Sequence, residues 1–160
     1  VAVVDGKATI DRSTFTRNSK ALFLDAGVFR VTNNFIVRND LGVDLFANGG
    51  TLIQFNTIVD NAKGLNCHAF DGPLQLQNNL LARNAMGADL SDCSLANSLN
   101  ANSAIGPLKF KSPDVAPFDY HITAGSSAVD HGSATTVNTD FDGQPRPAGA
   151  ASDMGADELQ

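Results

Sequence analysis

The sequence predicts an all-β fold: a single-stranded parallel β-helix (solenoid) of about five rungs, ending in an irregular C-terminal cap. The first observation is a six-residue phrase that recurs five times and closes on an asparagine each time. The second is an alternation of apolar and polar residues within each unit, and the third is a regular supply of turn residues. The closing asparagines are Asn18, Asn39, Asn61, Asn84 and Asn102.

The repeat length separates this architecture from its rivals. The phrases follow one another at intervals of 21, 22, 23 and 18 residues, so each unit must bury its apolar face by stacking on its neighbours. Helical arrays are excluded, because no unit has an apolar stripe at helical spacing. A leucine-rich repeat needs an apolar residue five positions before the asparagine, where this chain has Ser13, Asn34, Asn56, Asn79 and Asn97.

Short strands are predicted from the spacing of apolar residues. These lie two positions apart, as in Val43-Asp44-Leu45, which is the period of a strand with one buried face. Counted from each asparagine, they form four columns that we expect to fill the interior. The columns are Ile10, Val31, Ile53 and Leu76; Phe15, Ile36, Ile58, Leu81 and Leu99; Leu22, Val43, Leu65 and Ala88; and Leu24, Leu45, Cys67 and Leu90.

Turn residues divide each unit into three short strands. Breaks fall at Gly42, Gly64 and Gly87, and at the segments 48–50 and 71–73. We expect each strand to lie about 4.8 Å from its equivalent in the next unit. The closing asparagines would then stack at one turn and form a hydrogen-bonded ladder. Unconnected polar turn residues would explain one such asparagine, but not five in register.

The composition limits the function classes. The chain has 160 residues, of which 42% are apolar and 18% charged, as in ordinary folded domains. Its net charge of −6 would repel a phosphate backbone, so we expect no nucleic-acid partner. Because no stretch approaches eighteen consecutive apolar residues, we also expect no membrane insertion.

The chain opens in the middle of a rung, because Val1 and Val3 occupy the slots of Leu22 and Leu24. An uncovered terminal rung exposes unpaired backbone groups and an open apolar core. We therefore expect either missing upstream rungs or self-association through residues 1–10.

The two cysteines, Cys67 and Cys93, are too few for a disulfide framework or a structural zinc site. Cys67 shares a column with inward leucines, whereas Cys93 lies three positions further round the next unit. This count places their Cα atoms more than about 7 Å apart, which disfavours a disulfide. Their redox state is left open.

One external face is unusually apolar, and it lies beside the column of Phe15, Ile36, Ile58 and Leu81. Its members are Phe35, Val37, Val59, Leu80 and Ala82. Either a segment covers this face, or its β-branched residues merely suit an exposed sheet. The nearest covering segment follows Gly106 and offers Phe110, Phe118, Tyr120 and Ile122 as anchors.

The repeat ends at Pro107, so we divide the chain into rungs (1–106) and a capping segment packed on the same solenoid (107–160). The cap contains FDYHITAGSSAVDHG (118–132), TDFDGQPRP (139–147) and DMGADE (153–158). This ending resembles that of secreted bacterial right-handed parallel β-helix proteins of the pectate-lyase-like superfamily. The resemblance implies a right-handed coil, an extracytoplasmic location (secreted or cell surface) and association with polysaccharides or the cell surface. It implies no active site.

The first candidate ligand site is an outward column of oxygen-bearing side chains, Asp44, Asn66 and Asp89, with His68 close by. Side chains stacked about 4.8 Å apart could bind a cation or sugar hydroxyls. Two rungs separate Asp44 from Asp89, which is the wide limit of the carboxylate spacing in inverting glycosidases. A solvated polar face is the simpler interpretation.

A second external column holds Arg17, Arg38, Asp60 and Arg83. Guanidinium groups can clamp acidic sugars through paired hydrogen bonds. The interpretation that we favour is a surface ladder in which Asp60 neutralises Arg38 and Arg83.

In the cap, the segment Asp140-Phe141-Asp142-Gly143 is similar to the opening of a calcium loop. It lacks the later oxygen ligands and the closing glutamate of an EF-hand. We therefore expect a structural role, with Asp140, Asp142 or Asp153 paired to Arg146 and capping turn amides. No metal ligands are assigned and no cofactor is expected, calcium being the one ion to consider.

These observations favour a noncatalytic or cryptic β-helix module of a secreted or cell-surface protein, with polysaccharide as its candidate partner. One alternative is a fragment of a polysaccharide lyase or glycoside hydrolase that uses Asp44, Asn66 and Asp89. The other is a structural homo-oligomer assembled through its open N-terminal rung.

Overall fold

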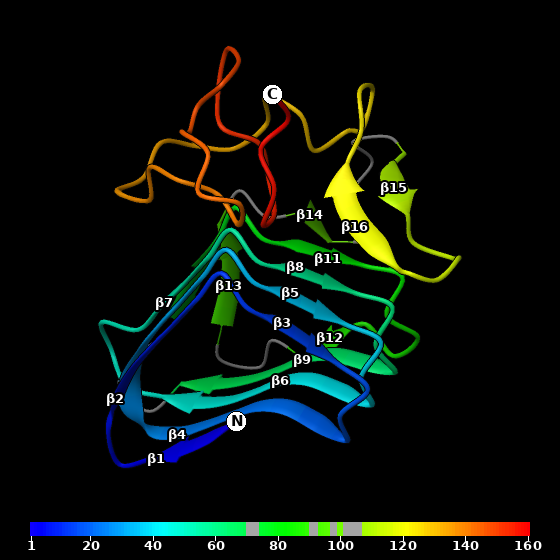
Figure 1. Ribbon diagram of the computed structural model, residues 1–160. Helices are drawn as coiled ribbons and strands as arrows, with labels where there is room; N and C mark the ends of the chain where they lie inside the picture. The colour runs from blue at the N-terminus through cyan, green and yellow to red at the C-terminus, as the bar shows by residue number, and fades with distance from the viewer. Residues whose placement is uncertain (70–73, 90–92, 97–98, 101–106) are drawn as a thin grey trace.

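The computed structural model describes residues 1–69, 74–89, 93–96, 99–100 and 107–160, and of residues 75, 88–89, 94–96 and 99–100 it describes the backbone alone (Figure 1). The described residues contain strands and no helix, so none of them forms a helix long and apolar enough to cross a membrane. The all-β prediction is confirmed.

Three parallel sheets enclose a single interior (Figure 1). Sheet A consists of β1 (Ala2–Val4), the first half of β4 (Lys20–Thr32), β6 (Leu41–Ala47), β9 (Lys63–Ala69) and β12 (Ala88–Asp89). Sheet B consists of β2 (Lys7–Asp11), the second half of β4, β7 (Leu52–Gln54), β10 (Leu74–Gln77) and β13 (Cys93–Ala96). Sheet C consists of β3 (Thr14–Thr16), β5 (Phe35–Val37), β8 (Thr57–Val59), β11 (Leu80–Ala82) and β14 (Leu99–Asn100).

The pairing register matches the predicted columns. Leu22 pairs with Val43 and Val43 with Leu65, so equivalent residues of successive units lie side by side. The column residues from the second unit onward whose side chains are described form the interior, and they are almost completely buried. Ile10 and Phe15 of the first rung are only partly buried, whereas the side chains of Ala88, Leu90 and Leu99 lie outside the described residues. The stacking of units is therefore confirmed wherever the side chains are described.

The second unit differs from the predicted division into three strands. β4 runs without interruption from sheet A into sheet B, because this unit has no Asn-Gly or Gly-Pro turn between them. The chain bends instead at Ala26, where φ is 51°, and the register with β6 shifts there. At the start of β6 and β9 glycine is required for a different reason: a Cβ on Gly42 would lie 2.4 Å from the carbonyl oxygen of Gly64.

The predicted asparagine ladder is present at the turn from sheet C to sheet A. Oδ1 of Asn39 accepts hydrogen bonds from N and Nδ2 of Asn18, both at 3.0 Å, and the same pair of bonds joins Asn39 to Asn61 and Asn61 to Asn84. Asn102 lies outside the described residues. The residue before each asparagine has a positive φ, of 56° to 59°, which turns the chain. These residues are Arg17, Arg38, Asp60 and Arg83.

A second ladder, which the sequence analysis did not predict, lies at the turn from sheet B to sheet C. Asn34, Asn56 and Asn79 are all fully buried. Oδ1 of Asn56 accepts from N and Nδ2 of Asn34, and Oδ1 of Asn79 accepts from the same atoms of Asn56. At both turns, therefore, a residue with positive φ precedes an asparagine that is hydrogen-bonded to the equivalent asparagine of the next unit.

The cysteine prediction is wrong: Cys67 and Cys93 form a disulfide, with their Cα atoms 6.0 Å apart. Cys67 points inward from β9, and Cys93 lies in register with Leu74, a buried residue of the interior. Counting positions along the coil overestimates their separation, because residues of two adjoining sheets face each other across a narrow interior. The bridge links sheet A to sheet B.

The C-terminal segment covers the apolar outer face of sheet C. It contains an antiparallel pair, β15 (Phe110–Ser112) and β16 (Asp119–Ile122), followed by irregular turns (Figure 1). Phe35, Val37, Val59 and Ala82 pack against Tyr120 and Ala156, with Leu108, Phe110, Phe118 and Phe141 around them. Leu80 packs against Ile122, Ala128 and Met154. The first of the two alternatives for this face is therefore the observed one.

The first rung has an open edge among the described strands. β1 and β2 each pair with β4 alone, and β3 pairs with β5 alone, so each has one free edge among the described strands. Val1 is 59% exposed and Val4 54% exposed. This edge is the surface on which the predicted self-association depends.

Candidate binding face on sheet A

The outer face of sheet A lies on the side of the solenoid away from the cap: in Figure 1, β4, β6 and β9 run along the bottom of the view and the cap lies at the top. Because alternate residues of a strand face opposite ways, two outward columns stand beside the buried leucines. In the first column, Phe23 pairs with Asp44 and Asp44 with Asn66. In the second, Asp25 pairs with Phe46 and Phe46 with His68.

A chain of polar side chains crosses this face. Lys20 Nζ lies 2.5 Å from Asp44 Oδ2, and Asn66 Nδ2 donates to Asp44 Oδ1 at 2.8 Å. Lys63 Nζ donates in turn to Asn66 Oδ1 at 3.1 Å. Asp44 is only 6% exposed, although it belongs to the outer face. Both of its oxygens are therefore held in place by neighbours from adjacent strands.

These contacts favour the ionised form of the Asp44 carboxyl. Burial acts to raise the pKa of its carboxyl, but the hydrogen bonds from Lys20 and Asn66, with the positive charge of Lys20, outweigh burial and lower the pKa below its ordinary value. Asp44 is thus an ionised, oriented acceptor. It is poorly suited to donate a proton, because a general acid needs a raised pKa.

Aromatic rings accompany the polar chain. The rings of Phe46 and His68 are stacked, with centroids 4.9 Å apart and an interplanar angle of 18°. Phe23 meets Phe46 edge to face at 6.3 Å, and Lys20 Nζ lies 4.5 Å from the centroid of the Phe23 ring. All three rings are half-buried, so part of each reaches solvent. The face therefore offers apolar ring surfaces next to fixed donors and acceptors.

Three of the four predicted site residues gather here. Asp44 and Asn66 are in direct contact, and His68 lies in the neighbouring column. The backbone of Asp89 pairs with Asn66, whereas its side chain lies outside the described residues. The sequence analysis missed Lys20, Lys63 and Phe46. Phe46 could have been predicted from the sequence, because it lies two positions after Asp44 on the same strand and must therefore lie on the same face.

The second predicted column serves the cap. Arg38 lies over the ring of Phe118, with its guanidinium carbon 3.7 Å from the ring centroid. Asp60 accepts a hydrogen bond from Tyr120 Oη at 2.7 Å and another from Arg83 Nε at 2.7 Å, and Arg83 also pairs with Asp114. Burial, reinforced by the bond to Asp60, raises the pKa of Tyr120 to about 12. These contacts tie the C-terminal hairpin to the solenoid.

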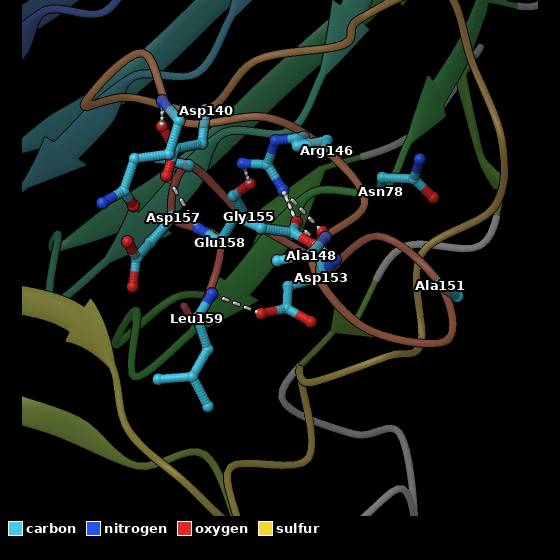
Figure 2. Close-up of polar contacts among 12 residues, drawn as sticks. Asn78, Asp140, Arg146, Ala148, Ala151, Asp153, Gly155, Asp157, Glu158 and Leu159 are labelled. Atoms are coloured by element: carbon cyan, nitrogen blue, oxygen red, sulfur yellow. Dashed lines mark hydrogen bonds and ion pairs between the residues drawn. The ribbon is translucent and has the colours of Figure 1, made fainter.

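Within the cap, Arg146 is the centre of a buried polar cluster (Figure 2). Its Nη1 donates to Glu158 Oε2 at 2.8 Å and to the carbonyl oxygen of Asp153 at 3.0 Å, and its Nη2 donates to the carbonyl oxygen of Gly155 at 2.8 Å. The guanidinium also lies 4.4 Å from the centroid of the Phe55 ring. The predicted pairing of Arg146 with an aspartate is therefore wrong, because Glu158 reaches it from twelve residues further along the chain.

The aspartates of the cap have a different role. Asp140 accepts hydrogen bonds from the backbone N–H groups of Gln144 and Glu158, and Asp153 accepts from those of Asp130 and Leu159 (Figure 2). The capping of turn amides is thus confirmed for both residues. Asp142 is exposed, and its Oδ2 lies 3.0 Å from His121 Nε2. The cluster around Arg146 fixes the path of the last turns.

Comparison with known proteins identifies the solenoid. A family model described as the right-handed beta helix region matches residues 1–141. No curated protein and no solved structure matches the chain. This match does not test the resemblance of residues 118–132, 139–147 and 153–158 to the pectate-lyase-like superfamily, which stays a prediction.

Proposed function

The chain belongs to the family of right-handed β-helix proteins, and from this premise we propose that it is a noncatalytic module that binds polysaccharide along the outer face of sheet A. The observation that supports the proposal is the composition of that face: stacked rings beside a polar chain whose members hold one another in place.

Sugar rings present an apolar face together with hydroxyl groups along their edges. A binding site for them needs aromatic surface next to precisely placed hydrogen-bonding groups. Phe46 and His68 supply the aromatic surface, and Asp44 and Asn66 supply the polar groups in the neighbouring column of the same two rungs. Since equivalent positions repeat at each rung, the face suits an extended polymer better than an isolated small molecule.

The electrostatics of Asp44 favour binding over hydrolysis. Hydrolases of the inverting and retaining types use a carboxylic acid with a raised pKa to protonate the leaving oxygen. Burial alone would raise the pKa of Asp44, but its hydrogen bonds to Lys20 and Asn66 lower the pKa overall. The fragment of a lyase or hydrolase is accordingly the second candidate.

The disulfide supports an extracytoplasmic location. Disulfides such as Cys67–Cys93 persist in oxidising compartments and are rare in the reducing cytosol. A polysaccharide-binding module at the cell surface or outside the cell would meet its ligand in such a compartment.

Affinity electrophoresis in gels that contain soluble polysaccharides tests this function. The panel includes neutral xylan and β-glucan and the uronate-rich polygalacturonate and alginate. We expect at least one polysaccharide to retard the protein, and Phe46→Ala to weaken retardation about tenfold or more, because a central aromatic anchor is lost. The control is Leu52→Ala, which removes an exposed apolar side chain from sheet B.

Retardation that is equal in wild type and Phe46→Ala, but lost in Leu52→Ala, would move the site to another face. The same polysaccharides, incubated with the protein with and without calcium, test the second candidate. Release of unsaturated or reducing ends that disappears in Asp44→Ala would replace the noncatalytic function with catalysis.

A further inference from the structure

A cluster in the cap brings together three segments that are distant in sequence. His121 comes from β16, Asp142 from the turn that follows Asp140, and Asp157 from the C-terminal stretch. One potential ligand atom from each of the three residues lies within 4.8 Å of the others. The cluster is separate from sheet A and plays no part in the proposed polysaccharide face.

The imidazole is oriented for coordination. Its Nδ1 lies 2.5 Å from Asp119 Oδ1, while its Nε2 points toward Asp142 Oδ2 at 3.0 Å. Histidines that bind metals usually have the other ring nitrogen held by a carboxylate in this manner. Lys111 contacts the second oxygen of Asp119 at 3.3 Å, so Asp119 is itself held in place.

Asp157 is the most buried of the three residues. It is only 5% exposed, and its Oδ2 accepts a hydrogen bond from the backbone N–H of Ile122 at 2.7 Å. The neighbouring carboxylates of Asp140 and Asp142 repel the negative charge of Asp157. A bound cation would offset this repulsion.

We propose that His121 Nε2, Asp142 and Asp157 bind a divalent transition-metal ion of the zinc type, which joins β16 to the two C-terminal turns. An imidazole ligand favours zinc over calcium or magnesium, which take oxygen ligands alone. Ligands of a tetrahedral zinc ion lie about 3.4 Å apart. The ligand atoms of the cluster lie within 4.8 Å of one another, and the exposed side chain of Asp142 can move to bring its oxygen closer to the other two ligands. A water molecule would complete the coordination.

Zn²⁺ added to the EDTA-treated full-length protein tests the site at about pH 8, where competition from protons is weak. We expect saturable binding of one ion by calorimetry and a rise in Tm on saturation. Both His121→Gln and Asp142→Asn should weaken binding roughly tenfold or more. Asp142→Asn is the safer variant for folding, because its side chain is exposed, and His131→Gln, at an exposed histidine of the same cap, is the matched control.

Co²⁺ provides a second readout. Its visible absorption should report nitrogen and oxygen ligands in wild type and His131→Gln, and should be lost in Asp142→Asn. The absence of saturable Zn²⁺ binding to the wild-type protein would overturn the proposal. Equal affinity in wild type, His121→Gln and Asp142→Asn would overturn it as well, since the ion would then lie elsewhere.

Discussion

At the scale of single residues, the short turns depend on buried amides that satisfy one another. Asn56 is fully buried, yet its oxygen accepts two hydrogen bonds from Asn34 and its Nδ2 donates to the carbonyl oxygens of Val31 and Gln54. A polar side chain is tolerated in this interior because almost every donor and acceptor has a partner. The sequence predicted one ladder of this kind, because five closing asparagines were counted in register. It missed the other ladder of Asn34, Asn56 and Asn79, because the equivalent position in the first unit holds Ser13 instead of an asparagine.

Asn56→Ala should lower the free energy of unfolding by about 3 kcal/mol or more, because it leaves the buried backbone N–H of Asn34 without an acceptor and removes the donor to the carbonyl oxygens of Val31 and Gln54. Urea denaturation followed by circular dichroism measures the loss. Asn18→Ala, at the exposed end of the first ladder, is the control and should cost less than about 1 kcal/mol. Equal losses in the two variants would mean that burial of the ladder does not determine its contribution.

Asp44 gives the outer face of sheet A a pH dependence. Its pKa in the folded state lies below the ordinary value of 3.8, so its interactions stabilise the fold above that pH and are lost as the pH falls through the folded pKa. The difference in unfolding free energy between wild type and Asp44→Asn should therefore be constant near neutrality and shrink below about pH 4. A difference that stays unchanged down to about pH 2 would contradict the assignment of this carboxylate.

At the scale of elements, the periodic part of the chain was predictable and the nonperiodic part was not. The strands and their inward columns follow from local alternation and a nearly constant repeat, so counting from the asparagines places Val43, Leu45 and Leu65 correctly. The count fails for Cys93, because distance along the coil does not measure distance across the interior. It also fails for Glu158, whose pairing with Arg146 depends on cap turns that have no period.

The disulfide should stabilise the junction of sheets A and B. It closes a segment with a sequence separation of 26 residues, for which constraint of the unfolded chain predicts about 3 kcal/mol. We expect a clear fall in Tm on treatment with reductant, measured by calorimetry. The double variant Cys67→Ala and Cys93→Ala should have a Tm similar to that of the reduced protein, and its Tm should not change on treatment with reductant. An oxidised wild type whose Tm is insensitive to reductant would contradict this contribution.

At the scale of the whole molecule, the outer faces of the solenoid differ in what covers them. The cap covers the outer face of sheet C through apolar packing and through the contacts of Arg38, Asp60 and Arg83. Among the described strands, β1 to β3 of the first rung each pair on one side only. Sheet A lies on the side away from the cap and carries the candidate binding face (Figure 1). The sequence could predict this face only in part, because Lys20 and Lys63 reach Asp44 and Asn66 from outside the columns.

The open edge predicts self-association of this chain in solution. Unpaired N–H and C=O groups of β1, with the exposed side chains of Val1 and Val4, favour pairing with another strand. Light scattering should show a mass that increases with concentration. Val4→Lys should reduce that increase, because a charged residue on an edge strand opposes pairing. A species that stays monomeric at high concentration would count against this interface.

The most direct test of the account is to map a bound oligosaccharide by NMR, using fragments of whichever polysaccharide retards the protein. We predict chemical-shift changes at outward residues of β4, β6 and β9, led by Phe23, Phe46 and Asn66, with little change in the cap. Changes confined to the cap or to sheet B, with sheet A unaffected, would contradict it.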